Sequence, residues 1–394
     1  MKTNVGVFFG GKSVEHEVSV ISALQAIGAI DKEIYHVVPV YIAKTGEWYS
    51  GDTLLEIERY KNTQELLRSA SKVHWKAGED GGAFLLYPER NWWQAEKPIR
   101  IDVALPVLHG TYGEDGCMQG LFELAGVPYA GCDVLSSACG MDKIVTKGLL
   151  KMADIPVIDF TWFYLKEWVR QPASLQNSIK QLGFPLIVKP ANLGSSVGIA
   201  KAQNAEELET AIATAGSFSQ RIIVEKMVEG LREINCSVVG DYEHAEVSVC
   251  EEPLRQGAFL SYEDKYLSSG GSKTEGQKGM ASTKREIPAN LTADLEEKVK
   301  YLAKKTFQTL GCAGVSRIDF ILDTKDNHLY VNEINTIPGS LSFYLWEPSG
   351  KKFGQLVQDL IDTAFKTHRE KGNLMFTYDT NIFQSFNAGK AGKK

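Results

Sequence analysis

Acidic and amide side chains alternate along two short apolar segments in the last third of the chain. Arg317 and Asp319 are two residues apart in the first segment, and Glu333 and Asn335 are two residues apart in the second. If both segments are strands, each pair lies on one face of a sheet, because strand side chains alternate between the two faces. Carboxylate and amide oxygens bind hard cations, and an adjacent guanidinium can stabilise negative charge in a transition state. These residues therefore predict a Mg²⁺ site with room for phosphate oxygens.

The geometry of this candidate metal site depends on how the two strands pair. A turn centred near Lys325 would place Arg317 opposite Glu333. Asp319 would then lie diagonally across, at about 7–8 Å between Cα atoms. The alternative is a solvated sheet face with a surface salt bridge. The turn at 336–339 favours the metal site, because it brings more backbone to the same place.

Two other segments contain residue types that suit a nucleotide. An apolar segment, 184–189, ends in Lys189 and precedes a loop, 192–198, that is rich in glycine and serine. A lysine supplies a point charge and free loop amides bind anions, so the pair suits a polyphosphate. The alternative is a hairpin whose lysine extends along apolar surface into water. Glu225 and Lys226 end another apolar segment, either as an adenine-binding hinge or simply as the end of a strand.

The N-terminal part offers a carboxylate and an imidazole near strand ends. Glu15 follows Gly10 and Gly11 at the start of a predicted helix, and His109 opens the glycine-rich run 109–116. Ligands bind at the carboxyl edge of a parallel sheet, which makes both residues candidates for ligand binding. The alternatives are a carboxylate that stabilises the helix N-terminus and a histidine that fills a loop.

Alternating strands and helices are needed to position these side chains. Strand-like apolar runs at 4–9, 35–42 and 101–108 alternate with helical periodicity at 15–29 and 115–125. That alternation predicts an α/β fold whose N-terminal sheet is parallel and doubly wound.

The remainder of the chain predicts further strands and helices around one irregular stretch. The patterned segments are 136–153, 184–189, 221–228, 292–310, 315–322 and 328–335. The segment 256–284 is polar and rich in glycine and serine, with almost no periodicity. A stretch of that length inside a compact domain is usually a functional lid or is disordered. The less regular segment 45–100 has no assignable chemistry.

The composition is that of a folded, reduced protein. The chain has 394 residues, of which 43% are hydrophobic and 23% charged, and its net charge is −6. That length allows two to three domains, and the charge gives no general basic footprint for nucleic acid. The six cysteines include no CxxC pair, which argues against a disulfide framework or a zinc site. No apolar run approaches the ~18 residues of a membrane helix. We therefore expect a cytoplasmic protein with no membrane or nucleic-acid partner.

Taken in chain order, nine short motifs resemble the ATP-grasp ligases and, within them, the D-alanine–D-alanine ligase family. The resemblance covers residues 4–365. One such motif would be weak, whereas the full set in the order of the family is specific. The motifs are Gly10-Gly11 to Ser19, HGTYGEDG at 109–116, Met141-Asp142-Lys143, VKPANLGSSVG at 188–198, Val224-Glu225-Lys226, Arg232-Glu233, Lys265-Tyr266, Ser316-Arg317-Ile318-Asp319 and Asn332 to Gly339.

The resemblance implies an ATP-grasp fold of three α/β domains, with ATP between the central and C-terminal ones. The N-terminal substrate-binding domain would span 1–130 and the central domain 131–229. The C-terminal domain would span 230–370, with the lid loop at 256–284. A flexible tail would occupy 371–394.

The resemblance also implies how the nucleotide and its metal ions are bound. Lys143 and Lys189 would contact the phosphates of ATP, and Asp319, Glu333 and Asn335 would hold two Mg²⁺ ions, which Mn²⁺ can replace. The full set of implied ATP-binding residues is Lys143, Lys189, Ser196, Glu225, Lys226, Val228, Glu233 and Lys265.

By the same resemblance, Glu15 would receive the ammonium of the first D-alanine and couple to Ser195 and Tyr266. Arg317 and the Gly339 amide would form an oxyanion hole. The implied catalytic residues are Glu15, Ser195, Tyr266, Arg317 and Gly339. The implied substrate-binding residues are Glu15, His109, Tyr344 and Leu345.

The implied reaction is the ATP-dependent ligation of two D-alanines through an acyl phosphate, for peptidoglycan precursor synthesis. The partners would be ATP, D-alanine and a second copy in a homodimer. One segment departs from the family: in the run 340–346, Tyr344 stands where a serine is expected to bind the carboxylate of the second substrate. This departure keeps open the same reaction with D-serine, D-lactate or another D-amino acid, although Tyr266 favours an amine nucleophile. A third hypothesis is a nucleotide-sensing protein without catalysis.

Overall fold

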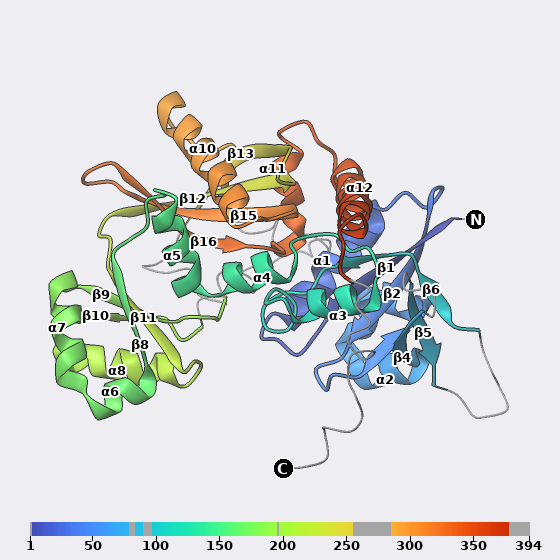
Figure 1. Ribbon diagram of the computed structural model, residues 1–394, viewed down its shortest axis with the longest axis horizontal. Coiled ribbons are helices and arrows are strands. Elements are labelled where there is room, and N and C mark those ends of the chain that lie inside the picture. Colours follow the sequence, from blue (N-terminus) through green and yellow to red (C-terminus); the bar gives the residue numbers. More distant parts are fainter. Residues whose placement is uncertain (1, 79–82, 90–96, 195–196, 255–284, 378–394) are drawn as a thin grey trace, which may run out of the picture.

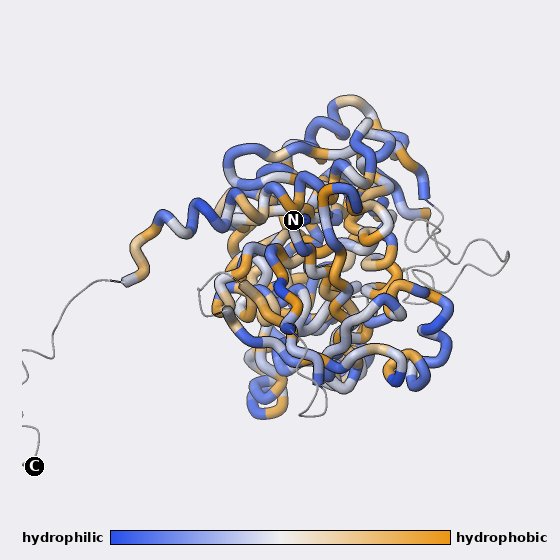
Figure 2. Tube along the Cα trace, turned by 90° about the vertical axis from the view of Figure 1, so that its right-hand side faces the viewer, coloured by the Kyte–Doolittle hydropathy of each residue, from blue (hydrophilic) through white to orange (hydrophobic). Residues whose placement is uncertain are grey.

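The chain folds around three β-sheets, which follow one another along the sequence (Figure 1). The computed structural model describes residues 2–78, 83–89, 97–194, 197–254 and 285–377. Hydrophobic stretches gather in the middle of the molecule and hydrophilic segments along its rim (Figure 2). Within the described part of the chain, every helix is too short or too polar to span a lipid bilayer. All six cysteines are free thiols.

The first sheet has seven strands in the order β6-β5-β4-β3-β2-β1-β7. Its strands are β1 (Thr3–Gly10), β2 (Tyr35–Ile42), β3 (Trp48–Ser50), β4 (Ser71–Ala77), β5 (Phe84–Pro88), β6 (Ile99–Ile101) and β7 (Val103–Pro106). Strand β1 pairs in parallel with β2 and β7, whereas the other neighbours are antiparallel. The sheet is therefore mixed, and the predicted parallel sheet corresponds only to β7-β1-β2. The antiparallel strands come from 48–101, where the sequence pattern was irregular.

Helices cover both faces of the parallel strands. They include α1 (His16–Ala29), α2 (Thr63–Ser69) and α3 (Cys117–Ala125), with the short helices η1 (Asp52–Leu55) and η2 (Ile57–Asn62) in the β3–β4 connection. Because side chains alternate along β1, Val5 and Val7 pack in one buried cluster with residues of α1 and the C-terminal helix α12 (Phe353–Gly372). Phe8 faces the other side, where it packs against Phe84 and Phe122. This packing fixes the carboxyl end of β1, from which the loop to Glu15 starts.

The second sheet has four antiparallel strands in the order β10-β9-β11-β8. They are β8 (Phe160–Tyr164), β9 (Leu186–Pro190), β10 (Ala200–Ala202) and β11 (Arg221–Lys226). Three helices belong to this layer, α6 (Leu165–Arg170), α7 (Pro172–Leu182) and α8 (Ala205–Gly216), and together with the strands they enclose a buried core. The side chain of Asn204 caps α8 by accepting a hydrogen bond of 3.0 Å from the Glu207 amide.

The third sheet has five strands in the order β14-β13-β12-β15-β16. They are β12 (Leu231–Gly240), β13 (Ala245–Pro253), β14 (Arg285–Glu286), β15 (Gly314–Asp323) and β16 (His328–Asn335). Helix α10 (Ala293–Thr309) packs on this sheet through a buried cluster that includes Val299 and Phe307. After β16 the chain forms η4 (Gly339–Ser342) and α11 (Phe343–Trp346) before α12.

The predicted helix at 136–153 is two helices, α4 (Val134–Met141) and α5 (Lys143–Met152). The break lies at Asp142, whose Oδ1 accepts hydrogen bonds from the amides of Ile144 and Val145, both 3.0 Å long. An aspartate in this position ends one helix and caps the next. The break places Lys143 at the N-terminus of α5, where its amide donates to the Ala191 carbonyl after β9 (2.8 Å).

Candidate functional site

The two candidate metal-binding carboxylates lie directly opposite each other. Asp319 on β15 pairs with Glu333 on β16, and Arg317 pairs with Asn335. The predicted register, with Arg317 opposite Glu333, is therefore wrong. The hairpin pairs Asp323 with His328, which is one residue off the predicted register. An irregularity at Asp319/Phe320, where Asn332 is an extra residue on β16, adds a second residue of shift. The shift brings Asp319 closer to Glu333 than a diagonal pair would be.

Arg317 holds Asp319 through two parallel hydrogen bonds. Its Nε lies 2.7 Å from Asp319 Oδ1, and its Nη2 lies 2.7 Å from Oδ2. Asn335 Nδ2 also donates to Asp319 Oδ2, at 3.1 Å. A two-pronged guanidinium–carboxylate pair fixes both partners in orientation. The side chain of Arg317 is therefore held on the face that carries the carboxylates.

The residues of this face fit a hard cation only in part. Among the residues that the structure describes, no three His, Cys, Asp or Glu side chains gather as a metal-binding group. Asp319, Glu333 and Asn335 contribute two carboxylates and one amide. Such a partial oxygen set suits Mg²⁺, which usually retains waters and takes further ligands from substrate phosphates.

Two lysines connect the second and third sheets. Lys143 Nζ donates to the Leu193 carbonyl (2.8 Å) and lies 3.4 Å from Glu333 Oε2. Lys189 Nζ lies 2.6 Å from Glu225 Oε2 and 3.4 Å from Asn332 Oδ1. Both ammonium groups, predicted to contact phosphates, therefore lie beside the strand that carries the candidate metal ligand Glu333.

A third lysine, which the sequence analysis did not identify, completes a buried cluster. Lys147 Nζ lies 3.0 Å from Glu225 Oε1, and the two side chains are 1% and 2% exposed. We call Lys147, Glu225 and Lys189 the lysine clamp. Burial alone would raise the pKa of Glu225, but the two lysines lower it to about 2. The signal was available, because Lys147 follows Lys143 by four residues and therefore lies on the same face of α5.

The other predicted adenine and ribose residues lie where the second sheet leads into the third. Lys226 ends β11 with an exposed side chain, and its amide donates to the Asp159 carbonyl (3.1 Å). Val228 is half-buried in the connection to β12. Glu233 is on β12, opposite Ile321 of β15. The connection between β11 and β12 thus brings these residues to one junction.

The carboxylate of Glu15 lies between two glycine-containing loops. A Cβ added to Gly110 would lie 2.7 Å from Glu15 Oε2, and one added to Gly194 would lie 3.2 Å from it. Glycine at these two positions therefore allows the close approach. Glu15 occupies the N-cap position of α1, but its side chain makes no capping hydrogen bond to that helix. The geometry thus favours ligand binding over capping.

His109 is buried and connects the N-terminal sheet to the turn before Gly339. Its Nδ1 lies 2.8 Å from the Ile337 carbonyl and its Nε2 lies 3.0 Å from Ser22 Oγ. Ser22 Oγ in turn accepts a hydrogen bond from the Ser340 amide (2.8 Å). Burial lowers the pKa of His109 to about 4, so the imidazole is neutral at pH 7. The residue therefore supports the turn that carries Gly339.

Glu114, in the same glycine-rich run as His109, was not identified from the sequence. Its Oε2 accepts from the Gly110 amide (2.7 Å) and its Oε1 from the Ile337 amide (3.0 Å). Burial, and then the charge of Glu15, raise the pKa of Glu114 to about 8. A signal was present in the sequence, because Glu114 is an acidic residue in the same run as the candidate ligand His109.

The segment after Gly339 has an unusual backbone. Ser340, Leu341 and Ser342 have φ values of 54°, 51° and 54°. Side chains disfavour this left-handed region, and such residues occur mainly where surrounding structure imposes them, often at functional sites. The turn then leads into α11, where Tyr344 is buried and Leu345 is completely buried. The Leu345 side chain therefore offers no surface to a substrate.

Four predicted site residues lie outside the described residues: Ser195, Ser196, Lys265 and Tyr266. The same is true of the lid predicted at 256–284 and of most of the predicted tail. Their proposed roles remain predictions.

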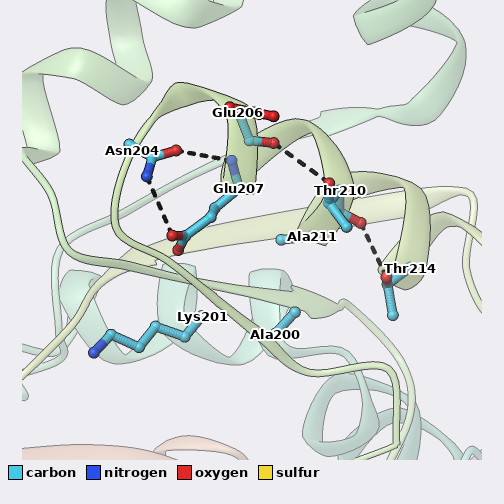
Figure 3. Close-up of a pocket in the computed structure, with 8 residues that line it drawn as sticks. All are labelled: Ala200, Lys201, Asn204, Glu206, Glu207, Thr210, Ala211 and Thr214. Atoms are coloured by element: carbon cyan, nitrogen blue, oxygen red, sulfur yellow. Dashed lines mark hydrogen bonds between the residues drawn. The ribbon is translucent and has the colours of Figure 1, made fainter.

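A surface hollow between β10 and α8 does not belong to this site (Figure 3). Its volume is about 420 Å³, and its hydrogen-bonded side chains, those of Asn204, Glu207, Thr210 and Thr214, bond within α8 and its cap. Asn204 binds Glu207, and the Thr210 hydroxyl donates to the Glu206 carbonyl. These are the internal hydrogen bonds of a helix start, and they give no reason to expect a ligand there.

Comparisons with known proteins give family-level matches over most of the chain. Residues 4–132 match the model of the D-ala D-ala ligase N-terminus, and residues 149–362 match that of the D-ala D-ala ligase C-terminus. The D-alanine–D-alanine ligase of Thermosipho africanus is 42% identical over 380 residues, which is 96% of this chain and 98% of that protein.

Solved structures of related ligases share the fold of this chain. The VanG D-Ala:D-Ser ligase of Enterococcus faecalis superposes with a TM-score of 0.78 at 31% identity, covering 92% of this chain and all of that one (100%). The D-alanine–D-alanine ligase of Coxiella burnetii has a TM-score of 0.76 at 28% identity, covering 94% and 96%.

Proposed function

This chain belongs to the D-alanine–D-alanine ligase family, and we propose that it joins two D-alanines into D-alanyl-D-alanine. The reaction converts ATP to ADP and phosphate, and the dipeptide serves peptidoglycan precursor synthesis. The family uses ATP together with a divalent metal ion.

One observation supports this function above the others. Lys143, at the start of α5, lies 3.4 Å from Glu333 on β16. A cation suited to phosphate and a carboxylate suited to a metal thus meet at the junction of the second and third sheets. A metal-bound polyphosphate needs both charges at one place. This is the junction where we place ATP.

The chemistry begins with a carboxylate, which is a poor acylating agent. An oxygen of the first D-alanine carboxylate attacks the γ-phosphorus, ADP leaves, and an acyl phosphate forms. The amine of the second D-alanine then attacks the acyl carbon, loses a proton, and releases inorganic phosphate. Both steps build negative charge on oxygen, so fixed positive charge is the expected means of catalysis.

We assign roles to the described residues accordingly. Glu15 receives the ammonium of the first D-alanine, and Lys143 and Lys189 bind the phosphates of ATP. Arg317 and the Gly339 amide stabilise the oxyanion of the second step. Glu225, Lys226, Val228 and Glu233 form the adenine and ribose pocket.

Asp319, Glu333 and Asn335 would hold the metal, for which we propose two Mg²⁺ ions, replaceable by Mn²⁺. When bound, such ions neutralise charge on the transferring phosphoryl group. In the structure Arg317 holds Asp319 from one side, which keeps this carboxylate oriented on the face that it shares with Glu333. We further propose that the protein acts in the cytoplasm as a homodimer.

The choice of second substrate separates this function from its alternative. The similarity to relatives named D-alanine–D-alanine ligase favours D-alanine as the acceptor. The departure at Tyr344 motivates a test with D-serine and D-lactate. The test is ADP release with Mg-ATP and D-alanine alone, with the product identified by mass. D-Alanyl-D-alanine at useful turnover supports the proposal, whereas product that requires a different second substrate would contradict it.

A further inference from the structure

The residue at the position of the expected serine does not present its hydroxyl to an open site. Tyr344 Oη donates a long hydrogen bond, 3.4 Å, to Glu251 Oε1, and the Tyr344 ring is buried. A carboxylate is an acceptor, so this hydroxyl is directed to the protein instead of to the carboxylate of a substrate. The acceptor carboxylate therefore needs a different partner.

An arginine lies on the face of the same ring. The Arg285 guanidinium carbon is 4.3 Å from the centroid of the Tyr344 ring, and Arg285 Nη1 is 2.7 Å from Glu251 Oε2. Glu251 also accepts a hydrogen bond from Asn235 Nδ2 (2.9 Å). We call Arg285, Glu251 and Tyr344 the acceptor cluster. A planar guanidinium that is stacked on a ring and paired at one edge is fixed in orientation.

The acceptor cluster lies in line with the candidate metal ligands. Glu251, Asn235, Asp319 and Glu333 are direct cross-strand partners on four neighbouring strands, β13, β12, β15 and β16. Partners in such a row lie on one face of the sheet. Since neighbouring strands are about 4.8 Å apart, Glu251 lies about 10 Å from Asp319. The acceptor cluster is thus separated from the candidate metal ligands by a single strand, β12, which carries Asn235.

Electrostatics places Arg285 near the catalytic arginine. Burial lowers the pKa of Arg285, while Tyr344 and Glu251 raise it by more, and Arg317 acts on it in the lowering direction. Burial also lowers the pKa of Arg317, while Asp319 raises it most strongly and Tyr344 and Glu251 raise it further. The two guanidinium groups therefore share the same surroundings. Arg317 is the cation assigned to the oxyanion, whereas Arg285 is paired with Glu251 beside it.

We propose that Arg285 is a specificity-determining residue of the acceptor site, whose guanidinium binds the carboxylate of the second D-alanine. Glu251 and the Tyr344 ring hold the guanidinium in place, so that this cation performs the task for which the family uses a serine hydroxyl. The inference rests on the proposed function and defines the class of acceptor, an amine that bears a carboxylate. Five N–H donors at several edges allow Arg285 to bind Glu251 and a second carboxylate together.

The test is a competition between two acceptors, D-alanine and D-alaninamide, which lacks the carboxylate. Full-length wild-type protein, Arg285→Met and Arg285→Lys are incubated with Mg-ATP, a fixed concentration of D-alanine and increasing D-alaninamide. Mass spectrometry gives the ratio of dipeptide to dipeptide amide. Lys351→Met is the matched control, because Lys351 also lies over a ring, Trp346, and pairs with Asp359.

Wild-type protein and Lys351→Met should both strongly prefer D-alanine. Arg285→Met should lose about 10- to 100-fold of that preference, the range of one charge-assisted hydrogen bond. Its KM for the second D-alanine should rise by the same factor, while the KM values for ATP and the first D-alanine stay unchanged. Arg285→Lys should be intermediate, because an ammonium lacks the planar fork.

An unchanged preference for D-alanine in Arg285→Met would overturn the assignment. If that variant does not fold, the lysine variant decides alone, and a wild-type preference in it would overturn the assignment equally. A failure of the proposed function looks different, because wild-type protein would then form neither dipeptide. A wild-type protein that accepts both amines equally would contradict the carboxylate requirement while leaving ligation intact.

Discussion

The lysine clamp and the acceptor cluster both contain buried cations and a buried carboxylate, but they differ in the ratio of positive to negative charge. In the clamp, Lys147 and Lys189 surround the single carboxylate of Glu225, so positive charge is in excess. In the acceptor cluster, Arg285 and Glu251 form a one-to-one pair. An excess of cations suits ATP, which carries several negative charges. A balanced pair on an aromatic ring suits a single carboxylate, for which orientation matters more than net charge.

Two buried carboxylates show the same contrast in their proton affinity. Two lysines lower the pKa of Glu225 to about 2, although burial opposes them. Burial and the neighbouring charge of Glu15 raise the pKa of Glu114 to about 8. Burial alone therefore does not decide the charge of a carboxyl group. The charges of its neighbours decide whether burial yields an anion or an acid.

The largest effect is expected from Glu225→Gln, which removes the only carboxylate of the clamp. Two buried lysines would then face each other without their shared counter-charge, at a cost of about 3–5 kcal/mol in the free energy of unfolding. The KM for ATP should rise as well, because Lys189 loses its orienting partner. Denaturant unfolding and steady-state kinetics measure both quantities. Glu206→Gln, at an exposed position on α8, is the control. Equal stability of the two variants would contradict the clamp.

The second largest effect, a loss of kcat, is expected from Arg317→Met. Arg317 belongs to neither the lysine clamp nor the acceptor cluster. Arg317→Met removes the cation assigned to the oxyanion and should lower kcat about 10²–10³-fold. The KM for Mg-ATP should rise by less than kcat falls, because the clamp is intact although Asp319 loses the guanidinium that orients it. Burst and steady-state kinetics, with folding checked by circular dichroism, measure the effect. A variant with normal kcat and a raised KM for ATP would move Arg317 to the nucleotide side.

A smaller, pH-dependent effect is expected from Glu114→Gln. In the unfolded chain Glu114 ionises near its ordinary pKa of 4.5, whereas in the folded protein it holds its proton up to about pH 8. The folded state therefore binds more protons in that window, and stability falls as pH rises from about 4.5 to 8. Glu114→Gln should remove this contribution, so its stability should fall less steeply with pH than that of wild type.

Unfolding measured at several pH values between 5.5 and 8 tests this prediction. Glu58→Gln, an exposed residue of η2, provides the baseline. Parallel curves for wild type and Glu114→Gln would mean that Glu114 is ionised throughout the window, as Glu225 is.

The smallest effect is expected at Cys117, which belongs to neither region. Cys117 is an exposed residue, but partial burial of its sulfur and the neighbouring Asp115 raise the pKa of the thiol to about 11. Little thiolate is therefore present at pH 7. Cys117→Ser should leave stability within about 0.5 kcal/mol of wild type and kcat unchanged. Loss of turnover in Cys117→Ser would indicate covalent catalysis, which neither region requires.

The sequence predicts the elements of the site better than their mutual arrangement. Period-two alternation was enough to predict that Arg317 and Asp319 share one face of a strand, and β15 confirms the strand. It could not predict the pairing of Asp319 with Glu333, because the register depends on the extra residue at Asn332. A bulge has no signal in hydrophobic periodicity.

Buried charges and short strands were missed for other reasons. Lys147 and Glu114 resemble ordinary polar helix and loop residues until the fold brings partners to them. The strands between 48 and 101 are short and antiparallel, so their patterns are too brief to read. The helix break at Asp142 was missed because apolar periodicity continues across it, although an aspartate before a lysine-rich helix is a capping signal.

In the proposed reaction, the carboxylate of the first D-alanine is phosphorylated on the nucleotide side, and its carbon is then attacked from the acceptor side. The most direct test uses D-alanine labelled with ¹⁸O in its carboxyl group, Mg-ATP and the wild-type protein. ³¹P NMR of the released phosphate detects the label through its isotope shift. We expect ¹⁸O to pass into inorganic phosphate in step with dipeptide formation. Unlabelled phosphate, or label in AMP, would contradict an acyl-phosphate intermediate. It would also contradict the proposal that the lysine clamp serves ATP and the acceptor cluster serves the second D-alanine.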